Sequence, residues 1–222
     1  MNKINGKNIN GHEKHDIIYI FNTQSALCYG FSGVMVRLQN QFHSKLDFTI
    51  LTKPKEADEK KMDIEDINLA IQQIKQIGKD CNVYFHDQFF ENLKENPVNF
   101  YETHMPARAL AAFRIYNFEQ SVSYANDIQQ LVFSEGRSIS DTDMYLNTAE
   151  KYGVNPDDFL HKMNSTEIEQ IVQNEYKMVQ NMGISKCPTL LLKKGKKIDP
   201  LFSGCKPYDW VEKLLDEKLE SE

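Results

Sequence analysis

Residues 16–31 have the sequence Asp16-Ile-Ile-Tyr-Ile-Phe-Asn-Thr-Gln-Ser-Ala-Leu-Cys-Tyr-Gly-Phe31. The β-branched and aromatic residues at its start predict a buried strand over residues 16–21. From about Ser25 onward apolar residues recur at helical spacing, so we expect a helix directly after this strand. Residues 46–51 predict a second strand. A strand, a helix and a strand with short connections favour two parallel strands joined by a right-handed crossover.

The middle of the chain, residues 54–182, has a helical pattern almost throughout. Asp63 is expected to cap a helix whose apolar face carries isoleucines at positions 64, 67, 71 and 74. Further helices are expected at 107–116 with Pro106 in the first turn, at 118–133, at 141–152, and from a capping box formed by Thr166 and Glu169 to Gly183. The predicted core of this helical block contains Ile67, Ile71, Leu110, Phe113 and Ile128.

The C-terminal part returns to strand character. Residues 189–192 predict a strand, residues 193–197 a hairpin turn, and residues 198–203 a second strand. A helix is expected from Pro207. The complete order is therefore β-α-β, a helical block, then β-β-α. It divides the chain into a sheet domain of residues 16–53 plus 183–222, an inserted helical domain of residues 54–182, and a leader of residues 1–15.

Composition and charge exclude several classes of function. The chain has 222 residues and a net charge of −6, without a long basic stripe, so a nucleic-acid partner is not expected. It has no apolar run of the ~20 residues that a membrane span needs, and no membrane association is expected. The leader is polar and lacks the apolar core of a secretory signal, which predicts a flexible leader and a cytoplasmic protein.

Two segments carry the chemistry: the turn that begins at Asn22 and the stretch Gly183-Ile-Ser-Lys-Cys-Pro-Thr189. Together they resemble the DsbA-like thioredoxin family, particularly its FrnE-like branch, in which Asp-Pro-x-Cys-x-x-Cys-Tyr-Gly follows the first strand and Gly-x-x-x-x-Pro-Thr precedes a later one. The resemblance runs from Asp16 through nearly the whole chain. It implies a thioredoxin fold of class α/β with a large helical insertion, a cis-proline at Pro188, and thiol–disulfide oxidoreductase or disulfide isomerase activity.

The chain departs from the family pattern at the positions that matter most for that activity. Ser25 occupies the place of the attacking cysteine and Cys28 that of the resolving cysteine. A serine hydroxyl cannot form a disulfide, so the usual two-cysteine reaction cycle cannot take place between positions 25 and 28. The resemblance therefore implies at best monothiol activity through Cys28 or Cys187. The alternative for Cys28 is a small buried apolar residue, and for Cys187 a residue that only fills space.

Other roles are open at this stage. A Cys28–Cys187 disulfide or a Cys187–client disulfide is conceivable, whereas Cys81 and Cys205 are interpreted as incidental. Tyr29, His104 and Thr189 are candidate substrate-binding residues, and no metal site is expected. The partners expected are protein thiols or a protein client.

Two rival functions follow from other resemblances. Kappa-class glutathione transferases and chromene-carboxylate isomerases carry a serine at the position of Ser25, which implies glutathione as a cofactor and Ser25 as its contact. The Spx-adaptor family is similar in architecture and implies a non-catalytic binding protein.

Overall fold

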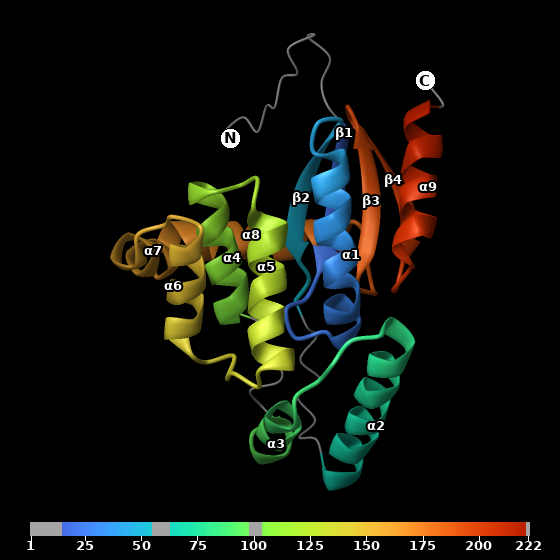
Figure 1. The fold of residues 1–222 in the computed structure, drawn as a ribbon. Helices are drawn as coiled ribbons and strands as arrows, with labels where there is room; N and C mark the ends of the chain where they lie inside the picture. The colour runs from blue at the N-terminus through green and yellow to red at the C-terminus, as the bar shows by residue number, and fades with distance from the viewer. Residues whose placement is uncertain (1–14, 55–62, 98–103, 221–222) are drawn as a thin grey trace.

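The computed structural model describes residues 15–54, 63–97 and 104–220 and contains one four-stranded sheet. The strand order is β2-β1-β3-β4 (Figure 1). β1 pairs with β2 in parallel, while β1 with β3 and β3 with β4 pair antiparallel. Both the predicted parallel pair and the predicted C-terminal hairpin are therefore confirmed. The strands are β1 (His15–Phe21), β2 (Leu46–Thr52), β3 (Thr189–Lys194) and β4 (Lys197–Ser203).

Helices cover both faces of the sheet. Alternate residues of β1 point to opposite sides: Tyr19 belongs to the cluster that includes α1 (Ala26–Phe42) and α9 (Tyr208–Glu220), and Ile20 to the cluster that includes α8 (Thr166–Asn181). Figure 1 shows α1 in front of the sheet and α8 behind it. Because both faces of β1 are buried, its sequence is a nearly continuous apolar run.

The described part of the insertion is helical. It consists of α2 (Ile64–Cys81), α3 (Asp87–Glu95), α4 (His104–Tyr116), α5 (Ser121–Gln129), a π-helical turn (Gln130–Ser134), α6 (Thr142–Lys151), α7 (Pro156–Met163) and α8. The five expected core residues are all buried, and Asp63 caps α2 through the N–H of Asp66. Ile64 was expected on the buried face but is 77% exposed, because it is the first residue of the helix.

Two local expectations are wrong. Residues 118–133 do not form one regular helix, because α5 begins at Ser121 and widens into a π-helical turn after Gln129. Such widened turns are rare, and the spacing of apolar residues does not reveal them. The N-cap of α8 is Ser165, whose hydroxyl accepts the N–H of Ile168, so the predicted box between Thr166 and Glu169 does not form.

Arg114 joins the insertion to the sheet and forms a buried ion pair within the insertion. The guanidinium of Arg114 in α4 donates to the carbonyl of Ile50 in β2 and to the carboxylate of Glu175 in α8. Both side chains are almost fully buried. Burial raises the pKa of Glu175, and Arg114 counteracts that rise. Two charges in such a site stabilise the fold only as a pair.

The sheet and the inserted helices share a hydrophobic core. One cluster of buried residues contains Tyr19 and Phe31 of the sheet layer together with Phe113 and Phe133 of the insertion. The expected leader lies outside the described residues except for His15, which begins β1. The division into two domains stays a prediction. Among the described residues, no helix combines the length and apolar character needed to cross a bilayer.

Candidate redox site

The turn of residues 22–28 joins β1 to α1 and is held by hydrogen bonds of its own side chains. Asn22 Oδ1 accepts the N–H of Gln24 at 2.8 Å, and the N–H of Ser25 donates to the Asn22 carbonyl at 3.1 Å. Ser25 has extended backbone angles, and its Oγ accepts the N–H of Cys28 at 3.3 Å. Ser25 is thus the N-cap of α1, a position that serine fills well.

Cys28 lies under the first turn of α1 and is completely buried. The N–H of Asn22 donates to Cys28 Sγ at 3.5 Å. Burial raises the pKa of the Cys28 thiol well above its ordinary value, and the neighbouring thiol of Cys187 raises it further. Hydrogen bonds from Ser25 and Asn22 lower the pKa and offset part of this rise. Cys28 is therefore a protonated, poorly accessible thiol with donors placed for its thiolate.

The loop before β3 brings a second thiol to Cys28. The peptide bond between Cys187 and Pro188 is cis, and the Cys187 side chain is in hydrogen-bonding contact with the Cys28 thiol. Cys187 is partly buried, whereas Pro188 is buried. The carbonyl of Pro188 accepts the N–H of Gly204 at 2.8 Å, which ties this loop to the segment after β4. Of the predicted site residues, Cys28 thus contacts both Ser25 and Cys187.

The three candidate substrate-binding residues have structural partners. Tyr29 is buried, stacks on Phe133 and donates its hydroxyl to the carbonyl of Tyr84 at 3.1 Å. Thr189 is buried and donates to the carbonyl of Lys186 at 2.8 Å.

The third candidate, His104, lies against Glu169, with His104 Nε2 and Glu169 Oε2 2.7 Å apart, within the insertion. These contacts give each of the three residues a part in holding the fold together. A role in substrate binding stays a prediction for all of them.

Sequence reasoning missed Gln129, which links the insertion to the turn. It is the last residue of α5, and its Nε2 donates to the carbonyls of Asn22 at 3.3 Å and Thr23 at 3.2 Å. Both Gln129 and the two turn residues are buried. A glutamine in an amphipathic helix gives no sequence signal for this contact, because it depends on how α5 crosses the start of α1.

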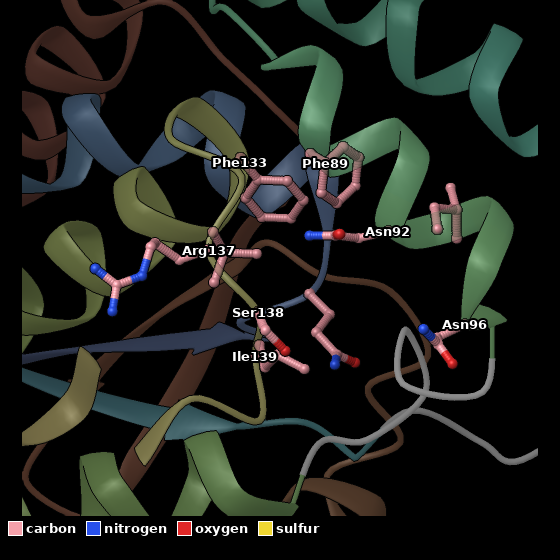
Figure 2. Close-up of a pocket in the computed structure, with 10 residues that line it drawn as sticks. Phe89, Asn92, Asn96, Phe133, Arg137, Ser138 and Ile139 are labelled. Carbon is pink, nitrogen blue, oxygen red and sulfur yellow. The ribbon is translucent and has the colours of Figure 1, made fainter. Parts of the chain in front are cut away.

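A pocket opens beside the turn. Its cavity volume is about 100 Å³, and Gln24 forms one wall. Figure 2 shows Phe89 and Phe133 side by side along the pocket, with Asn92 next to them and Ser138 and Ile139 along another side. The ring centroids of Phe89 and Phe133 are 4.9 Å apart. The pocket therefore offers an aromatic wall and polar groups, one of which, Gln24, directly precedes Ser25 in the chain.

A β-α-β unit and a β-β-α unit in one sheet, with a capped helix start beside a cis-proline loop, define a thioredoxin fold. The helical insertion gives it the DsbA-like form of that fold. The family profile described as thioredoxin matches residues 19–213, and the chain belongs to this family. No curated protein sequence matches it.

Solved structures agree with this assignment of the fold. A candidate protein disulfide isomerase from Nitrosomonas europaea is 19% identical, with a TM-score of 0.82 over 95% of this chain and 100% of that chain. The cytosolic disulfide reductase DsbM from Pseudomonas aeruginosa is 15% identical, with a TM-score of 0.74 over 93% and 100%. A 2-hydroxychromene-2-carboxylate isomerase is 13% identical, with a TM-score of 0.62 over 92% and 95%.

The cap at Ser25 predicts a measurable loss of stability. Replacing Ser25 with Ala removes the acceptor for the Cys28 N–H and should lower the free energy of unfolding by about 1 kcal/mol. Ser25→Asn keeps an acceptor at the N-cap and should stay within a few tenths of a kcal/mol of the native chain. Urea unfolding followed by circular dichroism measures both. Equal losses in the two variants would show that the cap contributes nothing.

Proposed function

We propose that this protein is a thiol–disulfide oxidoreductase in which Cys187 and Cys28 are the working pair, in place of the family's pair at positions 25 and 28. The observation that carries the proposal is the contact between the two thiols at the start of α1. In this arrangement Ser25 caps the N-terminus of α1, and the second sulfur comes from the cis-proline loop.

The burial of the two thiols sets their order of reaction. Cys187 is partly exposed, so its thiolate attacks an incoming disulfide, forms a mixed disulfide and releases one thiolate. Cys28 is fully buried and has a raised pKa, so it reacts second. Its thiolate attacks the Cys187 sulfur, forms the Cys28–Cys187 disulfide and releases the second thiolate. The incoming disulfide is thereby reduced by two electrons, and each protein thiol loses one proton.

Ser25 and Asn22 assist the second step. Their hydrogen bonds lower the pKa of Cys28, so both groups stabilise the Cys28 thiolate when it forms. These donors are fixed before the reaction by the turn itself, because the Asn22 side chain also holds Gln24 and its Nδ2 donates to the Lys53 carbonyl at 3.0 Å. Ser25 and Asn22 therefore contribute to the reaction, although neither forms or breaks a covalent bond.

The substrates proposed are a protein client and glutathione. The pocket lined by Gln24, with its aromatic wall and the amide of Asn92, is the proposed site for a peptide-like group of the substrate. DsbM, whose fold is similar, has been solved with GSH and is a cytosolic disulfide reductase. By this analogy we propose disulfide reduction in the cytoplasm, with glutathione regenerating the dithiol.

A second candidate function, in which the Ser25 hydroxyl contacts a bound glutathione thiolate as the resemblance to the isomerases implies, has weaker support. The Ser25 hydroxyl accepts the Cys28 N–H and bonds to the Cys28 sulfur. Both contacts occupy it within the turn. An adaptor without redox chemistry is the outcome left if the test below fails.

The test follows the mixed disulfide in variants that carry Cys81→Ser and Cys205→Ser, so that only the proposed pair remains. With glutathione disulfide, the parent should form an internal disulfide, and adding Cys28→Ser should trap one glutathionyl group on Cys187. Adding Cys187→Ser should slow reaction by about tenfold or more, because the remaining thiol is buried. Intact mass and peptide mapping identify each product.

Two results decide against the proposal. One is glutathionylation of Cys28 as fast as that of Cys187, which reverses the order of the thiols. The other is an inert parent that remains folded by circular dichroism, which favours the adaptor.

A further inference from the structure

A second pair of thiols lies on another flank of α1. Cys81 is the last residue of α2, and Cys205 lies in the segment between β4 and α9. They are 124 positions apart, yet both sulfur atoms lie within 3.6 Å of the position that a Cβ atom on Gly30 would take. Both are partly exposed, and both are reduced in this structure.

The absence of a side chain at Gly30 makes this contact possible. A Cβ atom placed on Gly30 would lie 2.7 Å from Cys81 Sγ, 2.7 Å from Cys81 Cβ and 3.6 Å from Cys205 Sγ. Both sulfur atoms thus lie over the same point of α1. A glycine inside a helix costs stability relative to alanine unless close packing requires it. Here α2 ends directly against the helix backbone, so the close packing explains the glycine.

We propose that Cys81 and Cys205 form a reversible disulfide, a second redox site that is chemically independent of Cys28 and Cys187. The oxidant is a low-molecular-weight disulfide such as glutathione disulfide. Oxidation would link the C-terminal end of α2 in the insertion to the segment that precedes α9. The bond would close the loop from residue 81 to residue 205. Among the cysteine pairs that do not include Cys28, this pair closes the longest loop.

The reaction takes place in two exchanges. Cys81 attacks the small disulfide and releases one glutathione thiolate, and Cys205 then displaces the second from the mixed disulfide. Each cysteine loses one proton, and the small disulfide gains the two electrons. Burial and the neighbouring Cys81 raise the pKa of Cys205 to about 12, which makes Cys205 the slower nucleophile and places it second.

Oxidation at this second site would affect the 22–28 turn and the cis-proline loop, each through one hydrogen bond. The Cys205 S–H donates to the carbonyl of Leu27 at 3.1 Å, and a disulfide sulfur has no hydrogen to donate. The neighbouring Gly204 donates its N–H to the carbonyl of Pro188, next to Cys187. The state of Cys205 is therefore connected to both segments that carry the first thiol pair.

The test uses the full-length chain with Cys28→Ser and Cys187→Ser, which leaves only the second pair. After equilibration with mixtures of glutathione and glutathione disulfide, free thiols are alkylated and the products are mapped as peptides. We expect a cross-linked peptide containing Cys81 and Cys205, with both residues protected from alkylation. Two alkylated thiols across the whole redox range, or a glutathionyl group on each cysteine without a cross-link, would overturn the proposal.

Two alanine variants of α1 in the same background provide a matched comparison. Gly30→Ala places a Cβ where the two sulfurs approach, so the yield of the cross-link should fall severalfold. Gly33→Ala lies one turn further along the same helix, where nothing comes within 4 Å of an added Cβ, and should leave the yield unchanged. Equal yields in the two variants, with both folded by circular dichroism, would contradict the assigned geometry.

Discussion

Ser25→Cys should give a protein that reduces insulin at least about tenfold faster than the native chain. Position 25 is the N-cap of α1, where the free N–H groups of the first helical turn stabilise an anion. Cysteines in such positions have pKa values of about 3.5–7.5, against about 8.5 for a free cysteine, so much more thiolate is present at neutral pH. Cys28 lies three residues further on, and the N–H of Asn22 already donates to its sulfur.

Cys187 complicates this variant, because it contacts Cys28 and would compete for the new disulfide. The gain should therefore be larger when Ser25→Cys is combined with Cys187→Val than in Ser25→Cys alone. Ser25→Ala, which removes the cap without adding a sulfur, is the control. If neither cysteine variant exceeds the native rate while both are folded, the start of α1 does not activate a thiol at position 25.

The largest loss of stability is expected from Arg114→Ala. This change leaves the carboxylate of Glu175 buried without its partner and removes a donor from the Ile50 carbonyl. Breaking a buried ion pair from one side typically costs about 3–5 kcal/mol. Replacing Arg114 and Glu175 together by Met removes both charges and should cost clearly less than Arg114→Ala alone. Urea unfolding at pH 7.5 measures both variants.

The cost of Arg114→Ala should also depend on pH. Burial already raises the pKa of Glu175 above 4.5 in the folded protein, and Arg114 lowers it, so removing Arg114 raises the pKa further. A carboxyl with a raised pKa in the folded state binds its proton more tightly there than in the unfolded chain. Stability is therefore lost as pH rises from about 4.5 through the folded-state pKa. The difference between variant and native chain should be smaller at pH 5 than at pH 7.5. A difference independent of pH would show that Glu175 gains another partner that holds its pKa where it is in the native chain.

Elements whose pattern is local could be predicted from the sequence. The apolar run of β1, the cap at Asp63 and the hairpin formed by β3 and β4 each depend on residues close to one another in the chain. The family resemblance places the cis-proline loop beside Cys28, which makes a Cys28–Cys187 disulfide conceivable from the sequence.

The remaining features depend on how distant helices meet. The contact between Cys81 and Cys205 requires the end of α2 to reach the segment before α9 over Gly30, and no spacing in the sequence indicates it. The π-helical turn after Gln129 is equally hidden, because the same residues are compatible with a regular helix. Ser165 and Thr166 are both good N-caps, so only the structure could choose between them.

Gln129 has a consequence for attempts to reduce this protein to a minimal version. Its amide holds two backbone carbonyls of the 22–28 turn, so part of the site's framework is supplied by a residue more than a hundred positions away. A shortened chain that joins the sheet halves directly and omits the helices would leave those carbonyls without their donor. The insertion therefore cannot be exchanged as an independent module, and grafting this site onto a smaller scaffold would require an equivalent donor at the same place.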